Sequence, residues 1–212
     1  MLKSRRMAWA LAIMIAGVGM FGTAAKADDL KIGIVDVEKV YTNAPRVTQY
    51  TEELNKYRQE LAQKLDVRSQ NMMLDEAEIQ ELITLKTKTT RTAEEDARIK
   101  ALEDIERTRD NEYKTLQATK DLDDQKKARL KELQDMNQKS KDTGNALAKD
   151  YDGQLQTKMQ ELNGKAEADV REAITKVVGQ KGVQIVLAKE AVLYGGTDIS
   201  DDVIKNLDRK IQ

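Results

Sequence analysis

Carboxylates, basic side chains and hydroxyls are the only groups of this chain that could do chemistry, because it contains no cysteine and no histidine. These two absences remove the most common nucleophiles, general bases and zinc ligands. After residue 27 the serines are Ser69, Ser140 and Ser200, and none lies in a glycine-rich turn or a Ser-x-x-Lys motif. Many aspartates and glutamates remain, but no pair stands out. We therefore expect no enzyme and no catalytic, cofactor-binding or metal-binding residue.

Residues 1–27 have the pattern of a bacterial signal peptide. The basic start Lys3-Ser4-Arg5-Arg6 precedes an apolar run, and Ala25-Lys26-Ala27 has the small-x-small form that a signal peptidase cuts. The alternative is an uncleaved anchor, because residues 7–25 nearly reach the ~20 residues of a spanning helix. No cysteine follows the run, which excludes a lipid anchor there. We expect cleavage after Ala27 and a mature chain in the periplasm.

Cleavage would change the composition of the chain. The signal carries four basic residues and no acidic one, so 32 Lys and Arg remain against 37 Asp and Glu, a net charge of −5. Trp9 and Phe21 are also removed, which leaves tyrosine as the only aromatic residue. The acidic balance and the lack of other aromatic side chains disfavour nucleic-acid binding.

The middle of the chain, residues 45–179, has the pattern of two long helices that pack on each other. Pro45 suits a first helical turn, where its missing N–H has no cost. Apolar residues then recur at steps of three and four, in residues 47–61 and again in residues 147–177. Each stripe is too narrow for a globular core and needs a partner helix. We therefore predict an antiparallel helical hairpin, a tentacle that projects from a small body.

The far end of this hairpin, within residues 84–124, is expected to be elaborated or kinked. Asp75–Glu78 and Thr92–Glu95 have the form of capping boxes, and Asp123-Asp124 can start a further helix. These signals indicate that helices end and restart there.

A short sequence recurs within the helical segment. Ala97-Arg-Ile-Lys-Ala-Leu102 resembles Ala128-Arg-Leu-Lys-Glu-Leu133, which lies 31 residues further on. This indicates local duplication of a helical unit, with too few copies for a solenoid.

Three glycines, Gly144, Gly153 and Gly164, lie in the second helix of the predicted hairpin. Each lowers helix stability by roughly 0.5–1 kcal/mol relative to alanine. Close packing against the other helix and freedom to bend explain them equally well.

The two ends of the chain are expected to form a β-rich body. Leu30–Asp36 and Val183–Leu187 are short and β-branched, as buried strands are. Val183–Leu187 and Ala191–Tyr194 are predicted to form a hairpin, after which Gly195-Gly196 turns the chain. Ser200 is expected to cap a last helix.

This body, residues 28–44 and 180–212, is small for one chain with such an arm. We therefore expect the chain to oligomerise, so that protomers complete one another's core. The residues expected to form the core of the body or oligomer are Ile32, Ile34, Val35, Val40, Val183, Ile185, Leu187, Val192, Ile204 and Leu207.

The two ends also resemble the Skp/OmpH family of periplasmic chaperones. The opening strand with its Val-Asp end and following proline is similar to the family's start, and the closing strands and final helix are similar to its end. The segments that carry the resemblance are Ile32–Asp36, Val40, Pro45, Val183–Leu187, Ala191–Tyr194 and Asp198–Ile204.

The resemblance implies an α+β fold, mainly α, with a body that becomes barrel-like in a homotrimer and three tentacles around a cavity. It implies an ATP-independent holdase that binds unfolded outer-membrane proteins and prevents their aggregation. It does not identify client-binding residues. A structural coiled-coil adaptor or spacer of the cell envelope is the alternative.

The chain departs from the family in charge. The best-known members are strongly basic, whereas this mature chain is acidic, and residues 84–124 hold 9 Lys and Arg against 11 Asp and Glu. The densest basic run, Lys126 to Lys131, is interspersed with acids and indicates a solvated helix face. Binding to lipopolysaccharide or a membrane surface therefore stays open.

Overall fold

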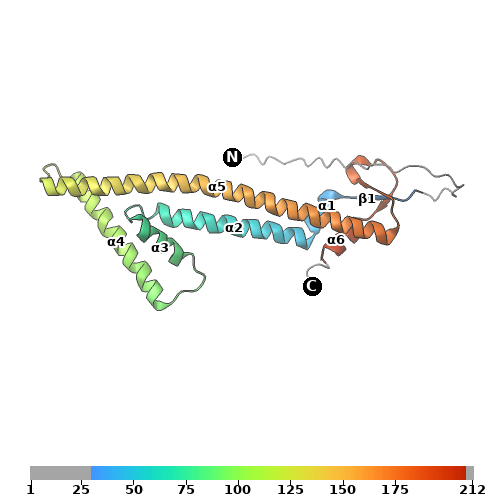
Figure 1. Cartoon of the computed structure of the whole chain (residues 1–212), viewed down its shortest axis with the longest axis horizontal. Coiled ribbons are helices and arrows are strands. Elements are labelled where there is room, and N and C mark those ends of the chain that lie inside the picture. Colours follow the sequence, from blue (N-terminus) through green and yellow to red (C-terminus); the bar gives the residue numbers. More distant parts are fainter. Residues whose placement is uncertain (1–29, 209–212) are drawn as a thin grey trace.

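The structure is a computed structural model that describes residues 30–208 of the 212. The expected signal peptide lies outside the described residues. The fold is α+β and mainly α, as predicted, with a small body at one end of long helices (Figure 1). In chain order the elements are β1 (Ile32–Val35), α1 (Val37–Asn43), α2 (Pro45–Ser69), α3 (Glu76–Lys86), α4 (Ala93–Ala118), α5 (Asp124–Lys181), β2 (Ile185–Ala188), a 3-10 turn (Lys189–Ala191), β3 (Thr197–Asp198) and α6 (Ser200–Asp208).

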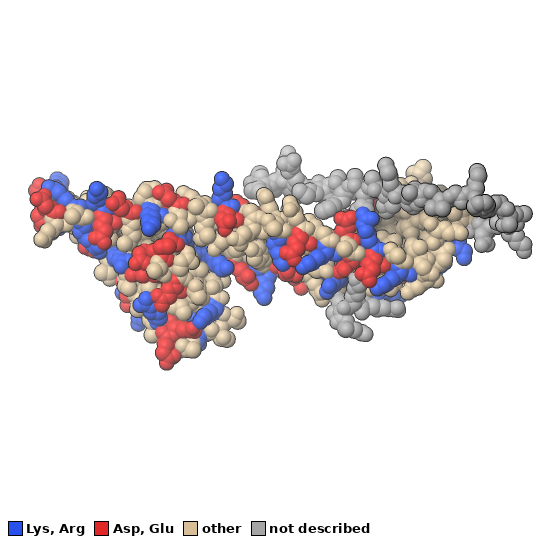
Figure 2. Space-filling model, viewed as in Figure 1, with Lys and Arg blue, Asp and Glu red and all other residues tan. Residues whose placement is uncertain are grey.

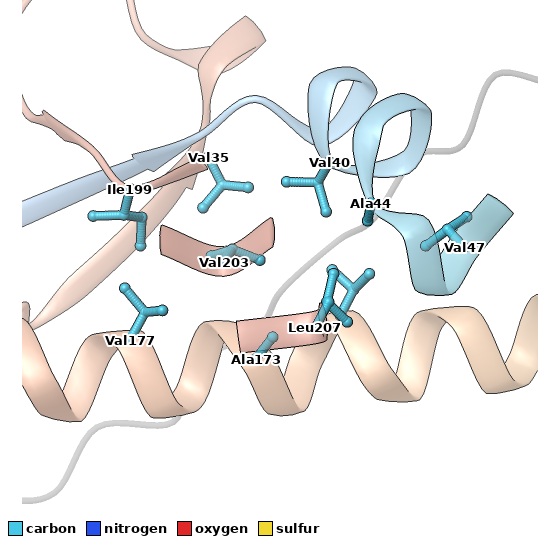
Figure 3. Close-up of a cluster of buried hydrophobic side chains, with 10 residues drawn as sticks. Val35, Val40, Ala44, Val47, Ala173, Val177, Ile199, Val203 and Leu207 are labelled. Carbon is cyan, nitrogen blue, oxygen red and sulfur yellow. The ribbon is translucent and has the colours of Figure 1, made fainter. Parts of the chain in front are cut away.

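The body is built on a three-stranded parallel sheet in the order β2-β1-β3. Ile32 pairs with Ile185 on one side of β1, and Gly33 pairs with Thr197 on the other. Apolar side chains from β1, α1, α5 and α6 converge beside the sheet in one core (Figure 3). The first strand is therefore held between two strands from the end of the chain.

The predicted β-hairpin of Val183–Leu187 and Ala191–Tyr194 is wrong. After β2 the chain makes a 3-10 turn and an irregular segment, and β3 then pairs with β1 in parallel. The two glycines do turn the chain, with φ of +89° at Gly195 and +86° at Gly196. A Cβ at Gly196 would lie 2.6 Å from Ile34 Cδ1, so only glycine allows the chain to pass there.

The arm consists of α2 packed along the middle of α5, with Tyr50 beside Asp169 and Tyr57 beside Gln154, which confirms the predicted antiparallel pair (Figure 1). Pro45 occupies the first turn of α2, as expected. α5 has 58 residues and no break, so it extends about 87 Å at 1.5 Å per residue. The predicted seams are the contact between the helices, with Leu61 on α2 and Leu162 on α5 both buried.

The far end carries a side lobe, which we define as residues 71–123 with α3 and α4. Figure 1 shows α3 turning away from the end of α2 and α4 running back to the start of α5. Both predicted capping boxes are present, Asp75 with Glu78 and Thr92 with Glu95. The lobe has its own apolar cluster, formed by Val67, Leu74, Ile79, Leu82, Ile83, Leu85 and Leu102 with Ile99 and Ile105 against them.

Of the three glycines that the sequence analysis singled out in α5, two do not serve close packing within the chain. A Cβ at Gly153 or Gly164 would meet nothing within 4 Å. At Gly144 it would lie 3.9 Å from Arg68, an ordinary contact distance. Close packing against α2 is therefore excluded as the reason for Gly153 and Gly164.

Candidate functional site

Some of the expected body residues lie in the core between the sheet and the helices. Val35, Val40, Val183 and Leu207 are buried. Val35, Val40 and Leu207 share one cluster with further buried side chains (Figure 3). Ile204 packs against this cluster. Sequence reasoning missed Ile199, which is fully buried in this cluster. Its only sequence signal was a single apolar residue between polar ones.

Other expected body residues lie on the opposite face of the sheet. Side chains alternate along β1, so Gly33 and Val35 face the core while Ile32 and Ile34 face away. Their partners on β2 are Ile185 and Leu187. We call Ile32, Ile34, Ile185 and Leu187 the open face of the sheet. Ile32, Ile34 and Ile185 are half-buried, as is Val192 nearby, and Leu187 is exposed.

The open face belongs to a larger apolar surface on the body. Among the described residues, the exposed large apolar side chains are Leu30, Leu187, Leu193 and Tyr194, and all lie in the body. Leu193 and Tyr194 have essentially their whole side-chain surface in water, at 106% and 99% of the reference. Within the described chain, β2 and β3 are also sheet edges without a further strand. Exposed apolar groups beside open edges are typical of a surface that binds another chain.

Polar contacts fix the end of β1 against α6. The Ser200 hydroxyl donates to Asp198 at 2.6 Å and accepts from the backbone N–H of Asp36 at 2.9 Å. Ser200 was expected to cap α6, but it is the first residue of that helix. The Val203 N–H bonds to the carbonyl of Ile199, so the helical hydrogen bonds begin one residue before Ser200. Asp36 caps α1 and accepts from Lys189 at 2.6 Å, which lowers the pKa of Asp36.

The base of the arm is joined by a cluster of three side chains. Asp169 on α5 accepts from the Tyr50 hydroxyl at 2.7 Å and from Arg46 Nε at 3.2 Å. The Arg46 guanidinium also lies 5.1 Å from the centre of the Tyr50 ring, a cation–π contact. Burial, followed by the neighbouring Asp169, raises the pKa of Tyr50. The cluster fixes α2 against α5 where the arm leaves the body.

A shallow groove of about 780 Å³ lies further along the arm. Its lining includes Tyr57, Ala146 and Gly153, with charged side chains such as Lys149 and Glu161 around it. The Tyr57 hydroxyl bonds to Gln154 across the two helices at 2.9 Å. Among the described residues, no atom lies within 4 Å of the position that a Cβ at Gly153 would take, so the lack of a side chain there helps to keep the groove open.

A buried arginine marks the junction of arm and lobe. Arg68, with only 3% of its side chain exposed, forms two hydrogen bonds with Glu76, at 2.8 and 3.2 Å. Its Nε has no hydrogen-bond partner within residues 30–208. A second cavity of about 220 Å³ lies beside this pair and is lined by Leu74, Met136 and Ser140 among others. The pair lowers the pKa of Glu76.

Charges of both signs are interspersed over the arm and lobe (Figure 2). The basic run at the start of α5 is matched by nearby acids: Lys126 pairs with Asp123, and Arg129 with both Glu112 and Glu132. This run therefore presents no concentrated positive surface.

Two further features are absent from residues 30–208. No group of three or more acidic side chains in residues 30–208 is placed to hold a metal ion. No helix in the same range is long and apolar enough to cross a membrane.

Comparison with known proteins gives the family. No curated protein matches the sequence. A family model described as "Outer membrane protein (OmpH-like)" matches residues 86–207, more than half of the chain, from the end of α3 into α6. The match includes the closing motifs that carried the resemblance, whereas the opening motif in residues 32–45 lies outside it; the chain belongs to the OmpH-like, or Skp-like, family.

Proposed function

We propose that this protein is an ATP-independent holdase chaperone of the periplasm that binds unfolded outer-membrane proteins between its arms and prevents their aggregation. Membership of the OmpH-like family supports the proposal. The observation that carries it is the combination of a long two-helix arm with a body that exposes an apolar surface at its base. The protein has no catalytic role in this proposal.

The proposal includes a homotrimer. The open face of the sheet, with Leu193 and Tyr194 beside it, is a surface that a second and third copy would cover. The outer edges of β2 and β3 would gain strand partners, so that the body becomes barrel-like and the arms surround a cavity. In this arrangement residues 28–44 and 180–212 form the trimerisation body, and residues 45–179 form the tentacle.

The proposed location follows from the sequence. Residues 1–27 direct the chain across the inner membrane and are removed after Ala27. Lipopolysaccharide is not part of the proposal, because the basic run at the start of α5 is matched by acids.

The proposed mechanism is confinement with weak contacts. Apolar side chains on the arm lie mostly between α2 and α5, and the arm surface is a mixture of charges and shallow grooves. Such a surface can hold an unfolded chain through many contacts, each weaker than the ~1.5–3 kcal/mol of full side-chain burial. The client can therefore leave when it folds.

Aggregation of an unfolded client tests the proposal. The mature chain, residues 28–212, has no tryptophan, so the emission of a tryptophan-containing outer-membrane protein reports on the client alone. We expect the chain to suppress light scattering after dilution from urea, with saturation near three protomers per client. An inert acidic coiled coil is the control. Scattering equal to that control contradicts the holdase.

A structural envelope adaptor is the second candidate. One observation favours it: the described part of the arm exposes no large apolar side chain, as expected of a helical spacer. A spacer would bind a fixed protein partner and would leave client aggregation unchanged. The scattering experiment therefore separates the two candidates.

A further inference from the structure

The lobe and the start of α5 contain two copies of one helical unit. Arg98 forms a bidentate pair with Glu81 at 2.8 and 2.7 Å, and Arg129 forms the same pair with Glu112 at 3.0 and 2.8 Å. Both pairs join residues that are 17 positions apart, and the second pair lies 31 positions after the first. The short sequence similarity therefore reflects a repeated three-dimensional contact.

Other features repeat with the same spacing. Thr92 caps α4 and Asp123 caps α5, so the two helices start 31 residues apart. Four apolar residues of α3 and α4 have apolar counterparts 31 residues further on, in α4 and α5, and the degree of burial agrees at each pair. The pairs are Leu85 with Leu116, Ile99 with Leu130, Leu102 with Leu133, and Ile105 with Met136.

Removing one copy would leave a plain two-helix arm. The end of α2 lies opposite residues 140–144 of α5, since Ser140 bonds to Met72 and a Cβ at Gly144 would lie 3.9 Å from Arg68. Residues 124–139 extend beyond that point, and residues 76–92 form a segment of nearly equal length. Without residues 93–123, α3 could pair directly with the start of α5. Glu81 would then meet Arg129, and Thr92 would stand at the N-cap of α5.

The copy is also the source of most of the acidic charge. Residues 93–123 hold 10 Asp and Glu against 6 Lys and Arg, a net charge of −4. The mature chain has a net charge of −5, so without this copy it would be nearly neutral. Net charge acts on association over distances that do not require contact.

We propose that residues 93–123 are a tandem copy of a helical unit added to a plain two-helix arm, and that the copy selects unfolded chains of positive over negative net charge. The second half of this proposal rests on the proposed holdase function. The first half does not.

Engineered cysteines test the repeat, because the chain has none of its own. In the chain that lacks residues 93–123, Glu81→Cys with Arg129→Cys should be joined within one protomer by a short bis-maleimide. In the full chain this pair should not cross-link, whereas Glu81→Cys with Arg98→Cys should. The deletion also removes Arg109, which bonds to Glu78, so we expect reduced thermal stability with helical content retained.

A chain with an additional copy of the unit provides a second test of the repeat if the chain that lacks residues 93–123 fails to fold. A second copy of residues 93–123 inserted after Asp123 should bring Glu112 of the first copy beside Arg98 of the second. A cysteine pair at these positions should cross-link. The repeat is overturned if neither altered chain forms its expected cross-link.

Association rates test the role of the copy. At low salt, a basic unfolded client should bind the deleted chain about 10-fold more slowly than the full chain, and the difference should vanish at high salt. The matched control is a full-length chain with Glu94→Gln, Asp96→Asn, Asp104→Asn and Asp121→Asn, which also lowers the negative charge by four.

The control should behave like the deletion. Equal association rates for all three chains would overturn the charge role. The charge role is also overturned if the deletion binds more slowly but the control binds as fast as the unchanged chain. If the full chain protects no client, the holdase function and the charge role fall together. The cross-links still decide the repeat in that case.

Discussion

Tyr50 on α2 donates a 2.7 Å hydrogen bond to Asp169 on α5, and the two residues lie 119 positions apart in the sequence. The bond joins the two helices of the arm where they leave the body. Tyr50→Phe removes it and leaves Arg46 paired with Asp169, so we expect a loss of about 0.5–1.5 kcal/mol in the free energy of unfolding. Urea unfolding followed by circular dichroism measures the change. A change near zero would show that the bond does not contribute.

The open space over Gly153 predicts a stabilising substitution. Gly153→Ala adds a methyl group that meets nothing, so helix stability should rise by about 0.5–1 kcal/mol and Tm by a few degrees. Gly182→Ala is the matched control, because Gly182 ends α5 with φ of +63° and an alanine there is strained. Its Tm should fall. A lower Tm for Gly153→Ala would contradict the open environment.

The buried Arg68 predicts asymmetric effects of breaking its pair. Glu76→Gln leaves the guanidinium buried without its counter-ion, so we expect a loss of about 1–3 kcal/mol. Adding Arg68→Met should recover part of that loss, since the methionine needs no hydrogen-bond partner. Urea titrations of the two single variants and the double variant provide the comparison. A double variant weaker than both single variants would rule out this explanation.

The arginine pairs predict how stability depends on pH. Arg98 and Arg129 lower the pKa values of Glu81 and Glu112 below their ordinary value of 4.5. A pKa that is lower in the folded chain means that the charged form stabilises the fold. This stabilisation is complete above pH 4.5 and is lost as the pH falls through the lower folded values. The urea midpoint should therefore fall in acid, and less steeply in Glu112→Gln.

Glu106 should act in the opposite direction. Burial raises its pKa, although its carboxylate accepts from Met73 N–H at 2.7 Å. Its protonation therefore favours the folded chain as the pH falls toward its raised pKa.

Because the chain has no histidine, no side chain of ordinary pKa titrates between about pH 6 and 8, and the urea midpoint should be constant there. A slope in that range would show that a side chain of shifted pKa, such as Glu106, titrates there.

The exposed body surface predicts a variant that dissociates. Leu193→Ser with Tyr194→Ser removes two large apolar side chains that touch little within the protomer. We expect a homotrimer for the unchanged chain and a smaller species for the variant by sedimentation equilibrium, with helical content unchanged. Leu61→Ser is the contrasting control, since Leu61 is buried in the arm and its loss should destabilise the helices. An unchanged mass for the Leu193 and Tyr194 variant would place the interface elsewhere.

The sequence predicted the helices well because helix starts depend on contacts between residues that are close in the sequence. The capping boxes at Asp75 and Thr92 satisfy N–H groups within one turn, so the sequence alone locates those helix starts. The narrow apolar stripes likewise required a partner helix, which α2 and α5 provide.

The strand pairing could not be predicted in the same way. Val183–Leu187 and Ala191–Tyr194 have similar propensities and lie close in sequence, which favours a hairpin. The observed partner of β2 is β1, more than 150 positions away. The burial of Ile199 and the Arg98–Glu81 pair also depend on contacts that sequence spacing does not show.

Because of the strand order of its sheet, the body can form only in a chain that includes the C-terminal strands. β1 is made first, yet its neighbours β2 and β3 come from the last 30 residues, and α6 closes the core after them. A nascent or truncated chain that lacks these segments cannot close the sheet. Only a chain that includes β2, β3 and α6 can therefore present the complete body surface to other copies.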